Sequence, residues 1–122
     1  MAFDYDSENI FAKILRGEIP NDTVLETEHS LAFRDIRPQA PVHVLVIPKG
    51  AYISYDHFAQ EASEAEIVDY VRAIGEVCRM EGVEGDGFRM ISNAGEHGVQ
   101  EVPHLHVHIL GGRPLGRMLQ QA

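Results

Sequence analysis

The sequence is poor in cysteine, and this scarcity sets the first limit on its fold. It has 122 residues and a single cysteine, Cys78. One cysteine excludes an internal disulfide framework and any cysteine-rich zinc module. A chain of this length can bury roughly two-thirds of its unfolded surface, so it needs neither kind of staple. We therefore expect one domain over residues 1–122.

Basic residues are also few. Ten lysines and arginines stand against 19 aspartates and glutamates, which gives a formal net charge of −9 at pH 7. Binding of duplex DNA or RNA depends on clustered basic residues, so nucleic acid is not an expected partner. A small nucleotide is compatible with this charge, because backbone N–H groups and a few neutral donors can hold its phosphate.

Long apolar runs are absent as well. No run approaches the roughly 20 residues that span a bilayer. Residues 1–11 are acidic and lack the basic and apolar regions of a signal peptide. We therefore expect a cytoplasmic protein that does not bind membranes.

The sequence does contain a succession of short apolar segments. They predict an α+β fold with an antiparallel sheet of about five strands, because most strands follow one another without a helix between them. A short N-terminal helix and one long amphipathic helix complete the fold, and the long helix opens with a capping box, Ser63 to Glu66. The near-continuous apolar strand over 42–47 predicts that both of its faces are covered. The helices are expected over 8–16 and 63–81, and the strands over 23–28, 30–36, 42–47, 87–93 and 102–110.

The last predicted strand carries three of the seven histidines, His104, His106 and His108. Alternate side chains of a strand share a face, so these histidines line up while the apolar residues between them face the core. Three interpretations follow: a solvated polar face, a zinc site of three imidazoles and water with Glu101 as the one obvious further ligand nearby, or nucleophilic catalysis by a neutral imidazole on phosphorus.

Residues 100–109, QEVPHLHVHI, resemble the histidine triad, His-φ-His-φ-His-φ-φ with φ apolar, which is the signature of the histidine triad (HIT) superfamily. Further segments match in the same order, and together they resemble its Hint-like branch, the purine nucleoside phosphoramidases. The resemblance covers about residues 8–114 and implies the HIT-like fold. The matching segments are 10–14 (IFAKI), 18–20 (EIP), 32–36 (AFRDI), 38–41 (PQAP), 43–49 (HVLVIPK) and 110–112 (LGG).

The resemblance implies roles for four histidines. The middle histidine of the triad is the family's nucleophile, and here it is His106. It attacks the α-phosphorus of a nucleoside 5′-phosphoramidate or related mixed anhydride, and water then hydrolyses the nucleotidyl-histidine. Imidazole suits both steps, because it is nucleophilic when neutral and its pKa lies near neutrality. His108 matches the phosphate-contacting member, and His104 and His43 match supporting histidines.

The resemblance also implies a purine nucleotide site. Asp35 matches the carboxylate that accepts hydrogen bonds from the ribose hydroxyls, and Asn93 matches a polar residue near the phosphate. On sequence alone, Asp35 is equally an ordinary strand-end aspartate and Asn93 a turn residue. Arg34 is a further expected substrate-binding residue, and the positions expected to wall the base pocket are Phe11, Ile14, Ile19, Phe33 and Ile36.

Two positions depart from the family pattern. Glu101 stands where many members carry Ser or Thr. A carboxylate repels phosphate, so Glu101 either points away from the site or acts on a protonated leaving amine. Val99 stands where a Gly-Gly pair is expected, and its backbone N–H or that of Gly98 is the expected phosphate donor.

These features predict a hydrolase that releases a nucleoside monophosphate, uses no metal or cofactor and forms a homodimer. Within the superfamily, the alternatives are a dinucleoside polyphosphate hydrolase and a nucleotidyl transferase. From another class, the alternative is a regulatory module in which the triad binds a nucleotide or a metal without catalysis.

Overall fold

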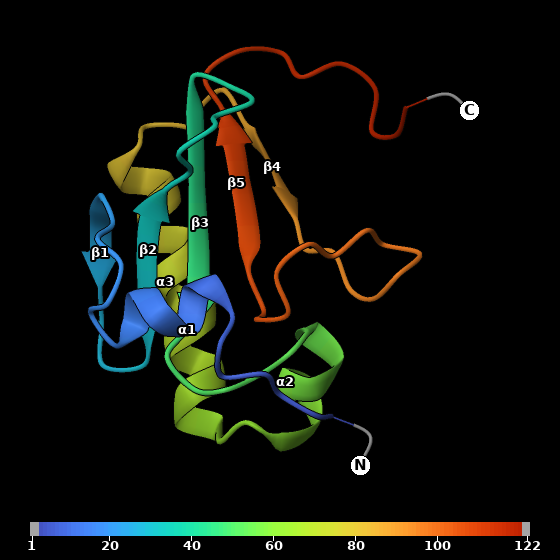
Figure 1. Cartoon of the computed structure of the whole chain (residues 1–122). Coiled ribbons are helices and arrows are strands. Elements are labelled where there is room, and N and C mark those ends of the chain that lie inside the picture. The colour runs from blue at the N-terminus through green and yellow to red at the C-terminus, as the bar shows by residue number, and fades with distance from the viewer. Residues whose placement is uncertain (1–2, 121–122) are drawn as a thin grey trace.

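The computed structural model describes residues 3–120, so the outermost two residues at each end of the predicted domain lie outside the described residues. At its centre is an antiparallel five-stranded sheet with the order β1-β2-β3-β5-β4 (Figure 1). The predicted α+β class and sheet are thus confirmed. The strands are β1 (Thr23–Glu26), β2 (Ser30–Arg34), β3 (Val42–Pro48), β4 (Phe88–Ile91) and β5 (Val107–Gly111).

The helices are α1 (Ile10–Leu15), α2 (Tyr55–Glu61) and α3 (Glu64–Met80). The predicted capping box is present, with the Ser63 hydroxyl accepting from the Glu66 N–H and the Glu66 carboxylate accepting from the Ser63 N–H. The sequence does not predict α2, because this seven-residue helix buries just His57 and Phe58 and shows no apolar stripe. The two predicted helices and the first four predicted strands agree with the observed α1, α3 and β1 to β4 within two residues at each end.

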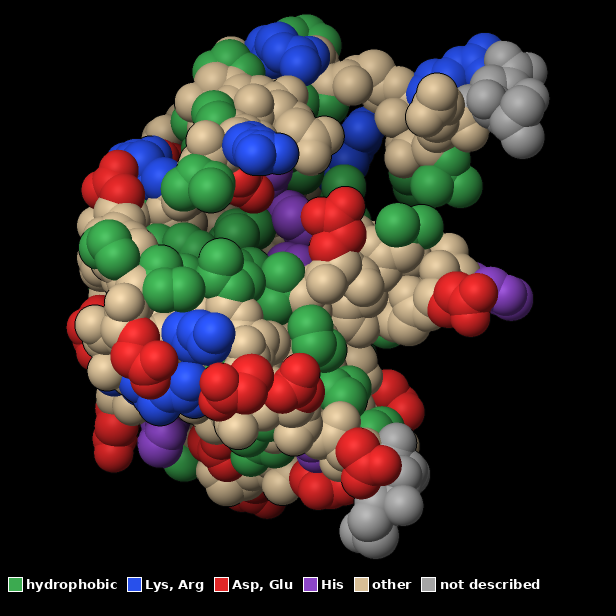
Figure 2. Space-filling view, viewed as in Figure 1, with side chains coloured by type: hydrophobic (Ala, Val, Ile, Leu, Met, Phe, Trp, Pro, Cys, Tyr) green, Lys and Arg blue, Asp and Glu red, His purple; other side chains and the backbone are tan. Residues whose placement is uncertain are grey.

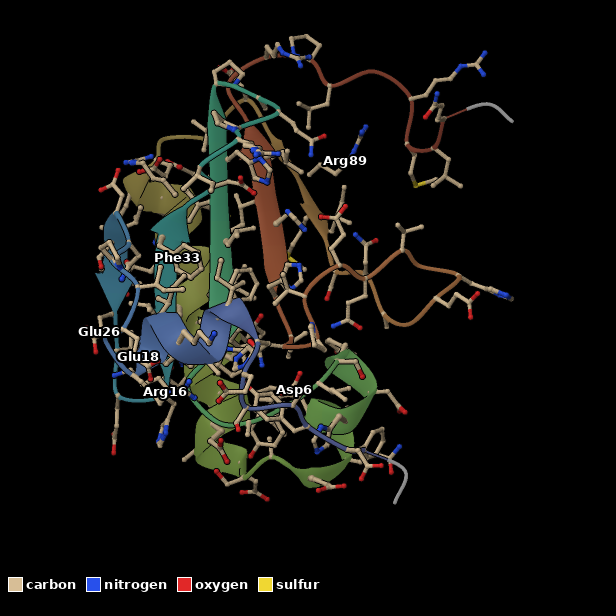
Figure 3. All side chains as sticks on the ribbon, viewed as in Figure 1. Asp6, Arg16, Glu18, Glu26, Phe33 and Arg89 are labelled. Atoms are coloured by element: carbon tan, nitrogen blue, oxygen red, sulfur yellow. The ribbon has the colours of Figure 1, made fainter. Side chains whose placement is uncertain are left out.

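The sheet carries a helix on each face (Figure 1). α3 covers one face, where Val44, Val46 and Val77 are fully buried. α1 lies on the other face, where Phe11 packs with Phe33 of β2 (Figure 3). β3 is buried along its length except at its first residue, as its near-continuous apolar sequence predicts. By alternation, His43 of β3 and His108 of β5 project on the α1 side, where Leu45 packs with Phe11.

The strand predicted over 102–110 starts late, at Val107. Pro103 has no N–H, and the N–H groups of His104 and Leu105 donate to carbonyls outside the sheet ladder, so this stretch cannot join it. The predicted alternation nevertheless persists, since Leu105 and Val107 both lie in the core on the α3 side.

The chain after β5 leaves the sheet as an extended tail (Figure 1). Arg89 of β4 holds this tail, because its guanidinium donates to the carbonyls of Gly116 at 2.8 Å and Arg117 at 3.1 Å (Figure 3). Within residues 3–120, no helix has the length and apolar character needed to cross a membrane.

Candidate active site

A cavity of about 500 Å³ opens on the α1 side of the sheet. This volume is in the range of small-molecule sites. Figure 2 shows it as a hollow with apolar side chains on one side and histidines and acidic side chains on the other. It brings together most of the predicted site: Phe11, Ile14, Ile19, Phe33, Arg34, Asp35, Ile36, Asn93, Val99, Glu101, His106 and His108 line it.

The backbone fixes the position of the proton on His106. Its Nδ1 lies 2.7 Å from the His104 carbonyl oxygen, which can only accept, so Nδ1–H is the donor. Nε2 of the neutral ring then keeps its lone pair. This Nε2 has no partner in residues 3–120, where every buried side-chain nitrogen and oxygen has one, so it is accessible. Since the ring borders the cavity, this lone pair is available to a molecule that enters it.

His104 supports this arrangement from behind and does not line the cavity. It is completely buried, and its Nε2–H donates to the Pro48 carbonyl at 2.8 Å. Nδ1 is therefore an acceptor, and the Tyr5 hydroxyl donates to it. These two bonds fix the ring of His104, whose own carbonyl is the acceptor for His106.

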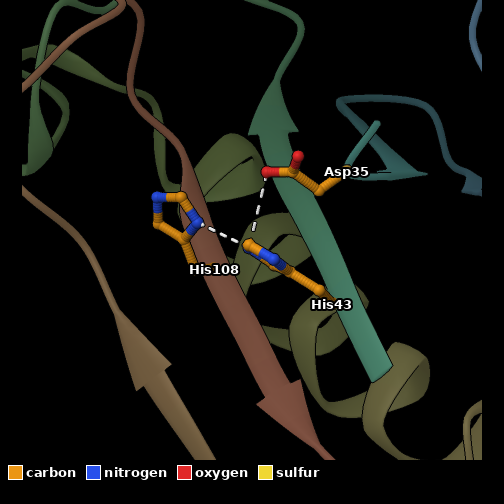
Figure 4. A group of neighbouring side chains, drawn as sticks. All are labelled: Asp35, His43 and His108. Carbon is orange, nitrogen blue, oxygen red and sulfur yellow. Dashed lines mark hydrogen bonds and ion pairs between the residues drawn. The ribbon is translucent and has the colours of Figure 1, made fainter. Parts of the chain in front are cut away.

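A relay of hydrogen bonds sets the proton on His108. The Gln39 backbone N–H donates to His43 Nδ1 at 3.1 Å, so Nε2 carries the proton of the neutral His43 ring. That Nε2–H donates to His108 Nδ1 at 2.9 Å (Figure 4). His108 Nε2 must then carry a proton, and it is accessible at the cavity by the same reasoning as for His106. Such a donor suits a phosphate oxygen.

The register of β3 against β5 explains why His43 and His108 meet although they lie on different strands. Leu45 of β3 stands opposite His108 of β5, so His43 is the diagonal neighbour of His108 on the same sheet face. Diagonal neighbours lie within reach of aromatic side chains. His43 therefore contacts His108 from behind the cavity wall, and its supporting role stays a prediction.

Asp35 follows β2 at the edge of the cavity. Its Oδ1 accepts from the Arg37 N–H at 2.8 Å, and its Oδ2 lies 3.5 Å from His43 Nε2 (Figure 4). A carboxylate has about four lone-pair sites, so capacity remains for a ligand's hydroxyl groups. The carboxylate is oriented by two neighbours and still lines the cavity.

Asp35, His43 and His108 also place potential metal-ligand atoms within 4.8 Å of one another. A metal ion needs an unprotonated nitrogen from each ring. His43 could free its Nε2 only by moving the proton to Nδ1, which faces the Gln39 N–H. The Nδ1–H of His43 would then face the Gln39 N–H, and neither group could accept a hydrogen bond from the other. The residues therefore fit a hydrogen-bonded relay and do not fit a metal ion.

Burial favours the neutral form of these histidines. Desolvation lowers the pKa of His104 to about 4. Desolvation first, and then the neighbouring His106 and His43, lower the pKa of His108 to about 4. The pKa of His106 is lowered by desolvation, against the raising effects of its carbonyl bond and of two nearby carboxylates. Desolvation lowers the pKa of His43 as well. At neutral pH, the rings are mostly in the form that a nucleophile requires.

The loop over 93–101 forms the remaining wall, and Gln100 anchors it. The Gln100 side chain donates to the carbonyls of Ile53 at 2.7 Å and Val102 at 3.0 Å, and it accepts from the Gly95 N–H at 3.1 Å. Val99 beside it has φ +56°, a left-handed conformation that is an outlier for a β-branched residue. The fixed loop holds Val99 in the conformation that the expected glycine adopts freely.

Glu101 faces the cavity. It lines the cavity, and its negative charge opposes the lowering of the His106 pKa. The alternative that Glu101 points away from the site is therefore wrong.

Three predicted residues differ from expectation. Gly98 is not part of the cavity lining. It packs instead on the Ala94 backbone, so closely that an added Cβ would lie 2.5 Å from the Ala94 carbonyl oxygen. Ile36 lies at the rim and is 89% exposed. Arg34 lines the cavity, but its guanidinium donates two hydrogen bonds to the Glu81 carboxylate after α3.

Sequence reasoning misses Tyr5, Gln39 and the anchoring role of Gln100. Tyr5 acts on His104, which lies 99 positions away in the sequence. Gln39 acts through its backbone N–H, which no side-chain pattern can reveal. Gln100 belongs to the segment that resembles the triad signature, and this placement is the one signal that could have found it.

Comparison with known proteins decides the family. The sequence model of the HIT domain matches residues 16–115. The chain belongs to the HIT domain family. This HIT protein is 60% identical over 119 residues to an uncharacterised 13.2 kDa HIT-like protein of Azospirillum brasilense, and the match covers 98% of each chain. It is 45% identical over 112 residues to the purine nucleoside phosphoramidase of Escherichia coli (strain K12), covering 92% of this chain and 93% of that protein.

A solved structure of a histidine triad protein from Clostridium difficile is similar to this HIT protein with a TM-score of 0.82 and 40% identity. The match covers 95% of this chain and 100% of that one. The resemblance and the HIT-like fold are thus confirmed, and the relatives support membership of a hydrolase family.

Proposed function

We propose that this HIT protein hydrolyses purine nucleoside 5′-monophosphoramidates or related nucleotidyl bonds. The arrangement of protons at the cavity carries the proposal. His106 offers a lone pair at Nε2, and His108 offers a donor at Nε2. Attack on phosphorus needs the lone pair of His106, and stabilisation of charge on the phosphate oxygens needs the N–H donor of His108. The likeness to the Escherichia coli phosphoramidase supports this choice.

The reaction proceeds in two displacements at phosphorus. His106 Nε2 forms a bond to the α-phosphorus while the P–N bond breaks, and the leaving nitrogen keeps the electron pair and takes a proton from water. Water then attacks the nucleotidyl-His106, so that a nucleoside monophosphate leaves and the neutral ring is restored. The His104 carbonyl stabilises the Nδ1–H of His106 while the ring bears positive charge.

The proposed nucleotide lies with its base against the apolar end of the cavity. Phe11 and Phe33 meet edge to face there, with ring centroids 5.6 Å apart. Asp35 stands at the rim and receives the ribose hydroxyls in this arrangement. No step of this reaction draws on a metal or cofactor, and the His43–His108 relay occupies the nitrogens of that pair that a metal ion would need.

We also propose that the protein forms a homodimer. β4 lies at the edge of the sheet, and its Phe88 and Met90 are exposed, as is Val71 on α3. An apolar edge strand is a suitable surface for a second copy. Light scattering at micromolar concentration should give twice the chain mass of 13.6 kDa. A mass of one chain would refute the dimer.

The test of the function compares two histidine variants on adenosine 5′-monophosphoramidate. His106→Asn should lower turnover on the order of 10⁴-fold or more, because the remaining groups cannot form the covalent intermediate. AMP affinity should change much less, since the apolar walls and Asp35 remain. His97→Asn, an exposed change in the 93–101 loop, is the matched control and should retain turnover.

Rapid acid quench with labelled substrate, followed by mass spectrometry, should locate the nucleotide on His106. Label on His104 or His108, or near-normal turnover by His106→Asn, would overturn the assignment.

A further inference from the structure

Glu101 places a carboxylate at the reacting end of the cavity. It lines the cavity together with Asn93, Val99 and His106. Within residues 3–120 its carboxylate has no hydrogen bond or ion pair. An exposed acid on a flexible loop would be unremarkable, but Glu101 follows Gln100, whose side chain is bonded on both sides. The backbone that carries Glu101 is therefore held next to an anchored residue, and its unpartnered carboxylate belongs to the same cavity lining as the proposed nucleophile.

No basic side chain that lines the cavity is free to neutralise this charge. Arg34 is the basic residue in the lining that the structure describes, and it holds Glu81 with two hydrogen bonds and lies 3.7 Å from Asp22. Asp35 adds a second carboxylate at the ribose end. The reacting end therefore has negative potential, which repels an anionic leaving group and attracts a cationic one.

We propose that Glu101 selects leaving groups that carry a positive charge of their own, such as the distal ammonium of a diamine. The inference rests on the proposed function, in which the leaving group departs from the α-phosphorus opposite His106 Nε2, within the cavity that Glu101 also lines. The P–N bond breaks and the reacting nitrogen takes its proton from water, as for any amine. The distal ammonium keeps its proton throughout, so pairing with Glu101 adds no proton transfer. The same carboxylate disfavours polyphosphate leaving groups.

The experiment uses three adenosine 5′-phosphoramidates of similar size. Their amines are 1,3-diaminopropane, which is cationic, n-butylamine, which is neutral, and 4-aminobutanoate, which is anionic. In the parent protein, kcat/KM should be about three- to fivefold higher for the cationic compound than for the neutral one, the scale of an exposed ion pair. The anionic compound should be the poorest substrate.

Glu101→Gln should remove this ranking, while Glu101→Asp should restore part of it. Glu96→Gln is the matched control, because Glu96 is an exposed acid of the same loop that does not line the cavity. It should keep the ranking. Equal kcat/KM values in the parent protein, or an unchanged ranking in Glu101→Gln, would overturn the proposal.

A binding measurement separates this proposal from the proposed function. If the parent protein turns over neither these three compounds nor adenosine 5′-monophosphoramidate, the hydrolase assignment fails. Calorimetry on His106→Asn then still compares the affinities for the cationic and neutral compounds. A preference for the cation that disappears in His106→Asn/Glu101→Gln supports the role of Glu101, and equal affinities refute it.

Discussion

Removal of the Tyr5 hydroxyl should destabilise the protein through a residue at the opposite end of the chain. That hydroxyl donates to Nδ1 of His104, a side chain with no solvent exposure. In Tyr5→Phe, this nitrogen remains buried and loses its donor, because Nε2 is already committed to the Pro48 carbonyl. An orphaned buried acceptor costs about 1–3 kcal/mol, so we expect the free energy of unfolding to fall by about 2 kcal/mol.

The assay is urea unfolding at pH 7 followed by circular dichroism. With a slope of about 1–3 kcal/mol per molar urea, the midpoint should fall by about 1 M. A chain of this length loses about 3–5 °C in Tm per kcal/mol, so the Tm should fall by about 6–10 °C. The slope itself should not change, because the folded state buries the same surface.

Tyr55→Phe is the matched control, since it removes the same atom from an exposed tyrosine of α2. It should change stability by less than about 0.5 kcal/mol. Nitrogen-15 NMR of the His104 ring should still find the proton on Nε2 in Tyr5→Phe, because the Pro48 carbonyl continues to require it. A Tyr5→Phe midpoint equal to that of the parent protein would refute the assignment of the buried acceptor.

Four further predictions follow from the site. Asp35→Ala should weaken AMP binding about ten- to a hundredfold and shrink the preference over 2′-deoxy-AMP, because charge-assisted bonds to the ribose hydroxyls are lost; calorimetry that finds both affinities unchanged would remove Asp35 from the ribose site. Val99→Gly should raise stability by about 1 kcal/mol in urea unfolding, since glycine adopts φ +56° without strain, and a loss of stability would contradict this. Stability should decline as the pH falls from 6.5 to about 4, because His104 binds a proton in the unfolded chain that it does not bind when folded, so a urea midpoint that is constant over this window would be inconsistent with the burial of His104. Chelator treatment should leave phosphoramidate turnover intact, and a loss that zinc restores would favour a metal site.

The periodicity of the sequence predicts most of this fold, because the spacing of apolar residues in each segment matches the faces that the segment buries. β3 and α3 are examples, since one is apolar throughout and the other is amphipathic with a capping box. The start of β5 cannot be predicted in this way. Alternation continues through His104 and Leu105, yet their N–H groups donate to carbonyls outside the sheet ladder. Side-chain alternation and backbone pairing are separate properties, and the sequence pattern reports the first.

In the candidate site, too, the sequence predicts which residues take part but not the contacts that they make. The family resemblance identifies His43, His106 and Asp35, and the structure brings them together. It does not reveal that the Arg34 guanidinium binds Glu81, which is 47 residues away in the sequence. It also does not reveal the proton positions, because these depend on acceptors such as the Pro48 and His104 carbonyls. Contacts between distant segments decide such details, and no local pattern encodes them.

The alternation of side chains along β3 and β5 separates two kinds of inherited variation. Odd-numbered positions of β3 and even-numbered positions of β5 face the cavity side, while the intervening residues pack beneath α3. Changes at Val44, Val46 or Ile109 therefore alter how firmly the domain is folded, whereas changes at His43 or His108 reach the cavity side, where the proposed chemistry takes place. A lineage can thus vary the apolar packing beneath α3 and leave the cavity side of the same strand as it is.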